Sequence, residues 1–254
     1  MFSIFFQIIG LKIPILYTWF LYYFKVLDQF PFLFYFYNQR LTAACSGLSF
    51  REETRVLDYG AGTGFLYDYL LSDDYSLSNY IGIDISADML NQSNIPVYQR
   101  EIGGLARLKK QQAQDYIFSL GVTTYMTELE LVEFLSIVRE KLQEDGRLII
   151  SFTNKNSLDF KIRLFFKNII PSSWVKKQSM GYPFILAYNV QEVEQLLFKE
   201  GIQVERVSYL NQTVFPFNKI TPRLAVFFAK RFLSKSRRPF LSSDFLIHAS
   251  ISPQ

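Results

Sequence analysis

The stretch VLDYGAGTGFL, residues 56–66, joins a short apolar run to a turn that holds Gly60, Gly62 and Gly64. A polar start at residue 54, an apolar run and a glycine stop are typical of a buried strand. Glycine has no Cβ, so its backbone can come close to a bound molecule. The helix expected over residues 63–72 adds N–H groups that lack helical partners. The stretch therefore predicts a strand, a ligand-binding turn and a helix.

Similar apolar runs follow along the chain, and helical patterns separate them. We expect strands over residues 54–60, 79–86, 95–101, 115–121, 147–154, 202–210 and 244–251. Helix start signals lie near Ser86, at the capping box Thr127–Glu130, and at Asn189 with Glu192. Gly146 and Gly201 are expected just past the ends of the last two helices. Strands that alternate with helices predict a mainly parallel sheet with helices on both faces.

The N-terminal residues are strongly apolar, but they do not form a clean membrane span. Lys12 and Pro14 interrupt residues 1–24, and a lysine at mid-membrane costs about 3 kcal/mol. Nothing basic precedes Lys12, as a signal peptide would require. We expect apolar helices over residues 1–50 that cover the domain. Contact with a bilayer surface and a true span remain alternatives.

Two carboxylates flank the glycine turn in sequence and in the expected sheet. Asp58 lies two residues before the first glycine, and Asp84 ends the second strand, twenty residues after Gly64. A carboxylate at the end of that strand can accept both hydroxyls of a ribose. Phe65 stands where the dinucleotide fingerprint needs its last glycine, so that fingerprint is not met. The alternatives are a plain strand–helix turn and a solvated acid at a strand end.

These motifs resemble the class I S-adenosylmethionine-dependent methyltransferases, especially the bacterial group that acts on small molecules and lipids. VLDYGAGTG is similar to the first motif of that family and GIDISADML to the second, and the likeness spans roughly residues 36–210. It implies a Rossmann-like three-layer α/β sandwich. The sheet would have seven strands, mostly parallel, with an antiparallel last strand. An N-terminal helical cover and an insert after the fifth strand would be additions to it. The resemblance also implies S-adenosylmethionine as the cofactor.

The resemblance implies a role for each residue of the cofactor site. Asp58 would orient the methionine amino group through water, and Asp84 would hold the ribose. The glycine turn would carry the methionine part, and apolar side chains would pack on the adenine. Glu101 would lie near the adenine amino group, although a surface role is its alternative. The implied set is Asp58, Gly60, Ala61, Gly62, Gly64, Asp84, Ile85, Met89, Glu101, Ile102, Ser119 and Leu120.

Catalytic groups are harder to find in this sequence. Tyr125 follows the fourth strand, where it could contact an acceptor, and a core position is its alternative. His248 is the only histidine and lies on an expected strand, which favours a structural or surface role. The sequence offers no His/Cys cluster, so we expect no metal site. The single cysteine, Cys45, excludes an internal disulfide.

The acceptor must be inferred from segments outside the expected sheet. The fourth strand ends in Ser119-Leu-Gly-Val122, without the prolines typical of enzymes that methylate base or amide nitrogens. The insert and the segment 223–235 combine bulky apolar residues with Lys and Arg. A basic amphipathic helix of this kind can lie on an anionic bilayer. We expect a hydrophobic acceptor such as a quinone, isoprenoid or lipid. A methyltransferase on RNA or protein and a non-catalytic, membrane-associated cofactor-binding protein are the alternatives.

The chain shows no repeat or flexible linker, and its net charge of +4 is too small to indicate nucleic acid. We expect one domain over residues 1–254 in the cytoplasm, with peripheral membrane contact as an open alternative. Within it we predict a helical cover (1–50), a cofactor-binding half (51–154), an insert over the acceptor pocket (155–188), and C-terminal strands with a basic helix (189–254).

Overall fold

The computed structural model describes residues 31–73, 75–169, 186–212, 222–230 and 239–252. A seven-stranded sheet runs through them in the order β3-β2-β1-β4-β5-β7-β6. The strands are β1 (Val56–Tyr59), β2 (Tyr80–Asp84), β3 (Arg100–Ile102), β4 (Gln114–Ser119), β5 (Leu142–Thr153), β6 (Ile202–Leu210) and β7 (Asp244–Ile251). β7 is antiparallel to both of its neighbours, and the pairs among β1 to β5 are parallel. The predicted fold class is confirmed.

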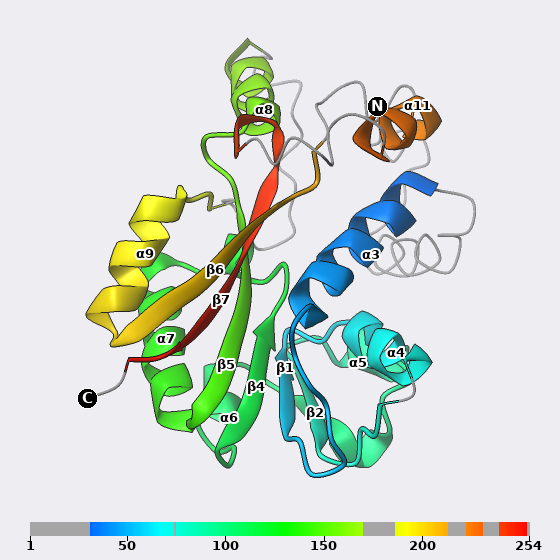
Figure 1. Ribbon diagram of the computed structural model, residues 1–254, viewed down its shortest axis with the longest axis vertical. Coiled ribbons are helices and arrows are strands. Elements are labelled where there is room, and N and C mark those ends of the chain that lie inside the picture. Colours follow the sequence, from blue (N-terminus) through cyan, green and yellow to red (C-terminus); the bar gives the residue numbers. More distant parts are fainter. Residues whose placement is uncertain (1–30, 74, 170–185, 213–221, 231–238, 253–254) are drawn as a thin grey trace.

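Helices cover both faces of this sheet (Figure 1). One face carries α3 (Pro31–Cys45), α4 (Phe65–Ser72) and α5 (Ala87–Asn91), and the other carries α6 (Leu105–Leu108), α7 (Glu128–Lys141) and α9 (Val190–Lys199). Each face has its own core of buried side chains, such as Leu41 and Leu70 on the first and Phe134 and Leu197 on the second. α8 (Leu158–Ile169) and α11 (Pro222–Phe228) lie beyond the sheet at one end.

The long helices begin where their caps predict. Thr127 Oγ1 accepts from Glu130 N at 3.2 Å while Glu130 Oε2 accepts from Thr127 N at 2.7 Å. Asn189 and Glu192 form the same reciprocal pair at the start of α9. Ser86 accepts from Met89 N and begins α5.

Two predicted boundaries are wrong. Residues 97–99 form a 3-10 turn, so β3 starts only at Arg100. Pro96 begins that turn with φ fixed at −56°, and proline cannot donate a sheet hydrogen bond. Gly146 does not follow α7, because the helix ends at Lys141 and Gly146 lies within β5. A Cβ on Gly146 would lie 2.9 Å from the Gln143 carbonyl oxygen within β5 and 3.0 Å from the Asp115 carbonyl oxygen on β4, so backbone atoms of both strands leave room only for glycine there.

Part of the predicted helical cover and of the basic segment lies outside the described residues. Of residues 1–50, the structure describes 31–50, which contain α3; of segment 223–235, it describes 223–230. Within the described ranges, no helix is long and apolar enough to cross a bilayer. The carboxyl ends of β1, β2, β4 and β5 and the start of β7 share one edge of the sheet, and α3 crosses beside that edge (Figure 1). This edge holds the candidate site.

Candidate functional site

The glycine turn after β1 is tied to the neighbouring strand. The N–H groups of Gly60 and Ala61 both donate to the Ile83 carbonyl on β2, at 2.7 and 3.0 Å. Gly60 has φ +83° and Gly62 has φ +54°, a region that other residues rarely adopt. A Cβ on Gly60 would lie 2.1 Å from Val122 Cγ2. Gly64, at φ +82°, begins α4. Residues with a side chain could therefore not replace these glycines, and the backbone of the turn stays uncovered.

Asp84 lies directly beside this turn at the end of β2. Its Oδ2 accepts from Gly62 N at 2.8 Å, and its Oδ1 accepts from Ser86 N at 2.8 Å. Burial raises the pKa of Asp84, and these two hydrogen bonds oppose the shift. Each carboxylate oxygen has a further lone pair, so the group is oriented and can still accept from a ligand.

Asp58 is more deeply placed than Asp84. It is 4% exposed, and its Oδ2 accepts from the Tyr80 hydroxyl at 2.7 Å. Burial raises the pKa of Asp58 to about 7; the Tyr80 hydrogen bond opposes this shift, and the nearby Asp84 adds to it. Tyr80, which the sequence interpretation did not single out, is therefore part of the site.

Apolar side chains surround the Asp84 end of the sheet. Ile85 is 62% exposed and Ile102 is 54% exposed, although both are large aliphatic residues. Ile102 is the register partner of Asp84 on β3, and the half-buried Glu101 is that of Ile83. Met89 Cε lies 3.3 Å from where a Cβ on Gly62 would stand. A flat apolar ligand group beside Asp84 would find aliphatic neighbours here.

At the end of β4, Ser119 is fully buried and Leu120 is half-buried. Ser119 Oγ has no hydrogen-bond partner among the described residues. A buried polar atom without a partner is costly, and a bound ligand or water would explain it. This orphaned hydroxyl, the glycine turn and the oriented Asp84 carboxylate together fit a nucleoside ligand with a polar tail.

The structure separates the two catalytic candidates. Tyr125, in the 3-10 turn Thr123–Tyr125, is 54% exposed near the edge that carries the glycine turn. His248 lies four residues into β7, where its Nε2 is 2.8 Å from Arg206 Nη2 and 3.1 Å from the Ala43 carbonyl oxygen. Burial, aided by the Arg206 cation, lowers the pKa of His248 to about 4. These contacts tie α3 to the sheet and do not bring His248 to the glycine turn.

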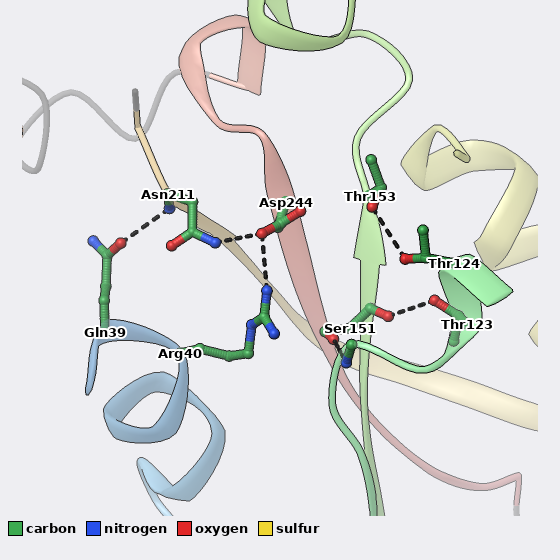
Figure 2. Close-up of polar contacts among 9 residues, drawn as sticks. Gln39, Arg40, Thr123, Thr124, Ser151, Thr153, Asn211 and Asp244 are labelled. Carbon is green, nitrogen blue, oxygen red and sulfur yellow. Dashed lines mark hydrogen bonds and ion pairs between the residues drawn. The ribbon is translucent and has the colours of Figure 1, made fainter. Parts of the chain in front are cut away.

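A polar cluster that the sequence interpretation missed lies at the same edge (Figure 2). Arg40 Nη2 contacts Asp244 Oδ2 at 3.0 Å, and Asn211 Nδ2 donates to the same oxygen. Gln39 Oε1 accepts from Asn211 N at 2.9 Å. One signal could have revealed Arg40: it is the only charged residue in the helix PFLFYFYNQRLTAAC. Within the described part of the chain, no group of three or more His, Cys, Asp or Glu residues could hold a metal ion.

Comparison with known proteins identifies the family of the chain. The family described as methyltransferase domain matches residues 50–182 of the chain, which is just over half of its length. No curated protein sequence matches the chain.

Solved structures share the fold at low sequence identity. A SAM-dependent methyltransferase from Archaeoglobus fulgidus is 18% identical with a TM-score of 0.58, over 90% of this chain and 99% of that one. Magnesium protoporphyrin IX methyltransferase from Synechocystis PCC 6803, solved with bound SAH, is 17% identical with a TM-score of 0.55, over 83% of this chain and 78% of that one.

Proposed function

The chain belongs to the methyltransferase domain family, and we propose that it transfers a methyl group to a hydrophobic small molecule. Family and fold together make it a class I methyltransferase that uses S-adenosylmethionine. The bound sulfonium supplies an already activated methyl group, so the protein contributes mainly by positioning the two reactants. The acceptor and the role of each site residue are the proposed parts.

One observation carries the assignment of the cofactor site. The Asp84 carboxylate is held by the N–H groups of Gly62 and Ser86, so it faces the ligand side of the glycine turn in a fixed orientation. We assign the ribose to Asp84 and the adenine to the exposed side chains of Ile85 and Ile102, with Met89 and Glu101 beside them. The methionine part would lie on Gly60, Ala61, Gly62 and Gly64, between Asp58 on one side and Ser119 and Leu120 on the other.

Aromatic side chains next to this site support an apolar acceptor. The rings of Tyr37 on α3 and Phe65 on α4 stack with centroids 5.0 Å apart. Burial raises the pKa of Tyr37, the Arg40 cation opposes this shift, and Tyr125 adds to it. An apolar or aromatic acceptor would gain from burial against such rings. We further propose that helices outside the sheet cover this acceptor, as predicted from the sequence for the helical cover (1–50) and the insert (155–188).

Two experiments, one after the other, test the binding of the cofactor and the class of the acceptor. Calorimetry should show S-adenosylmethionine binding, and the cofactor should raise the melting temperature by mass action. The protein should then transfer labelled methyl groups from the cofactor to material in an organic extract of lipids and quinones. Label that enters only RNA or protein would contradict the proposed acceptor class. Cofactor binding without transfer to any fraction would contradict catalysis.

A further inference from the structure

Arg40 and Asp244 form an ion pair at the carboxyl edge of the sheet, although their positions in the sequence are 204 residues apart. Arg40 comes from α3, and Asp244 is the first residue of β7, the register partner of Thr153 at the end of β5. Their side chains are only 18% and 16% exposed. A partly buried ion pair of this kind loses hydration on both groups and adds little stability on balance, so its presence calls for another reason.

The atoms around this pair are incompletely satisfied. Arg40 and Asn211 both contact Asp244 at Oδ2, and no described residue donates a hydrogen bond to Oδ1. Arg40 Nε and Asn211 Oδ1 are buried without partners among the described residues. Asn211 also has φ +59°, the only positive φ of a non-glycine residue in the described ranges. Asparagine adopts this left-handed conformation more readily than most residues, and buried polar atoms without partners tend to occur at binding sites.

The pair also lies close to the end of β4. Arg40 Nη1 lies 3.0 Å from where a Cβ on Gly121 would stand, two residues beyond Ser119. Gly121 N donates in turn to Ser151 Oγ at 2.7 Å. Arg40 lies 5.9 Å from the ring centroid of Tyr37, which stacks on the first residue of α4. Arg40 thus bridges the end of β4 and the start of β7.

We propose that Arg40 and Asp244 bind the hydroxyl group of the acceptor and that Asp244 takes its proton, which makes the reaction an O-methylation of an apolar alcohol or phenol. This inference rests on the proposed function. A hydroxyl both donates and accepts, so it can donate to Asp244 Oδ1 while it accepts from Arg40. A carboxylate acceptor would face the charge of Asp244. An ammonium acceptor would face the charge of Arg40.

The proposed step balances within these groups. The acceptor oxygen forms a bond to the methyl carbon while the carbon–sulfur bond breaks, and that electron pair passes to sulfur. The O–H bond breaks in the same event, and its proton goes to Asp244 Oδ1, which later releases it to water. Asp244 acts as a general base. Arg40 and Asn211 hold its other oxygen, so the carboxylate is oriented before the acceptor arrives.

The test uses a matched pair of probes on the full chain, without turnover. We would measure by calorimetry, with SAH present, the affinities for 4-hexylphenol and for 4-hexylanisole, which lacks the hydroxyl proton. The wild type should bind the phenol at least about tenfold more tightly than the ether. Asp244→Asn should reduce this ratio to about threefold or less, because its amide cannot accept at both positions. Glu205→Gln is the control, because Glu205 pairs with Arg147 in the middle of β5, six residues before Thr153.

Each outcome is decisive. Equal binding of the two probes by the wild type, or no measurable binding of the phenol, would overturn the inference without any variant, even if Asp244→Asn failed to fold. An unchanged ratio in a folded Asp244→Asn would also overturn it. Cofactor affinity, measured in the same samples, keeps the proposed function separate: loss of cofactor binding with a persistent phenol preference would refute that function and leave the hydroxyl site standing.

Discussion

At the scale of single residues, a buried carboxyl group makes the cofactor end of the sheet sensitive to pH. Burial raises the pKa of Asp58 to about 7, so between about pH 4 and about pH 7 the folded protein binds a proton that the unfolded chain has released. The contribution of Asp58 to stability therefore falls as the pH rises through this window, and the full penalty applies above about pH 7.

Replacing Asp58 by asparagine should remove this penalty. We expect Asp58→Asn to gain stability relative to the wild type between about pH 5 and about pH 8, by at most about 3 kcal/mol. Denaturant titrations at both pH values measure the difference. Tyr80→Phe removes the hydrogen bond that lowers the pKa of Asp58, so it should move the wild-type transition to higher pH. Parallel pH profiles for the wild type and Asp58→Asn would show that Asp58 does not titrate in this range.

Loss of the Asp84 carboxylate should weaken cofactor binding directly. A hydrogen bond to a charged group contributes about 1.5–3 kcal/mol, so Asp84→Ala should lower the affinity for S-adenosylmethionine roughly ten- to hundredfold. Calorimetry gives the change in affinity. Asp88→Ala is a matched control, because Asp88 is exposed on the adjacent helix α5 and should leave the affinity unchanged. Equal affinities for Asp84→Ala and the wild type would remove Asp84 from the ribose site.

Gly62 and Gly60 should respond differently to substitution. Gly62→Val places a branched side chain at φ +54° against the flexible end of Met89, so the variant should fold but lose cofactor binding. Gly60→Ala should instead destabilise the fold, since its Cβ would collide with Val122. Thermal melts and calorimetry separate these effects. A Gly62→Val protein that binds normally would mean that the ligand lies elsewhere.

At the scale of helices and strands, short-range signals decided which boundaries could be predicted. β1, β2 and β4 follow from apolar runs that end in glycine or polar residues, and α7 and α9 follow from reciprocal caps. The apolar residues from 95 onward did not predict the start of β3, because Pro96 begins a 3-10 turn in place of the strand. Gly146 resembles a helix stop in the sequence, but it lies within β5, where backbone atoms of β5 and β4 leave no room for a Cβ. A short stretch of sequence does not show which strand will lie beside it or how closely that strand will approach.

For the same reason, the sequence predicted one part of the candidate site and missed another. The glycine turn and Asp84 lie on consecutive strands of one compact motif, so spacing alone pointed to them. Arg40 meets Asp244 only because α3 packs beside the start of β7, from opposite ends of the chain. No spacing rule connects such residues. A lone cation in an apolar helix is the kind of signal that would direct attention to them.

The cap of α7 provides a test at this scale. Thr127→Ala removes an acceptor for Glu130 N and should lower the free energy of unfolding by about 1 kcal/mol. Ser136→Ala on the exposed side of the same helix is the control, and it should be neutral or slightly stabilising because alanine favours helix. Denaturant unfolding measures both. Equal stabilities for the two variants would show that the cap contributes nothing here.

At the scale of the whole molecule, the helices and the turn that lie beyond the carboxyl edge of the sheet carry exposed apolar side chains. They come from α8, the 3-10 turn Pro239–Leu241 and α11, and they are Leu164, Phe165, Leu224, Phe227 and Phe240. α8 and α11 lie toward the same end of the molecule in Figure 1. Lys161 lies 5.5 Å from the Phe240 ring centroid, and Lys230 lies 5.5 Å from that of Tyr35. Aromatic residues and lysines together suit the surface of an anionic bilayer.

We therefore predict reversible binding to vesicles that contain phosphatidylglycerol, weakened by salt because each charge contributes about 1 kcal/mol. Phe165→Ser with Phe227→Ser should release at least about half of the bound protein while cofactor affinity stays unchanged. Val97→Ser with Tyr98→Ser is the control, because these exposed residues precede β3 at the opposite edge of the sheet. Sedimentation at low salt measures binding, and no sedimentation of the wild type would refute a peripheral site.

The order of the strands has a consequence for biosynthesis. β7 follows β6 in the chain yet lies between β5 and β6. A nascent polypeptide that has emerged from the ribosome only as far as residue 243 cannot attach β6, and the outer edge of β5 stays unpaired. That edge is a template for aggregation until translation delivers residues 244–251. Asp244 arrives with the same strand, so the ion pair with Arg40 forms only once the sheet is complete. Chaperones that shield open sheet edges would accordingly matter most to this protein in the moments before β7 emerges.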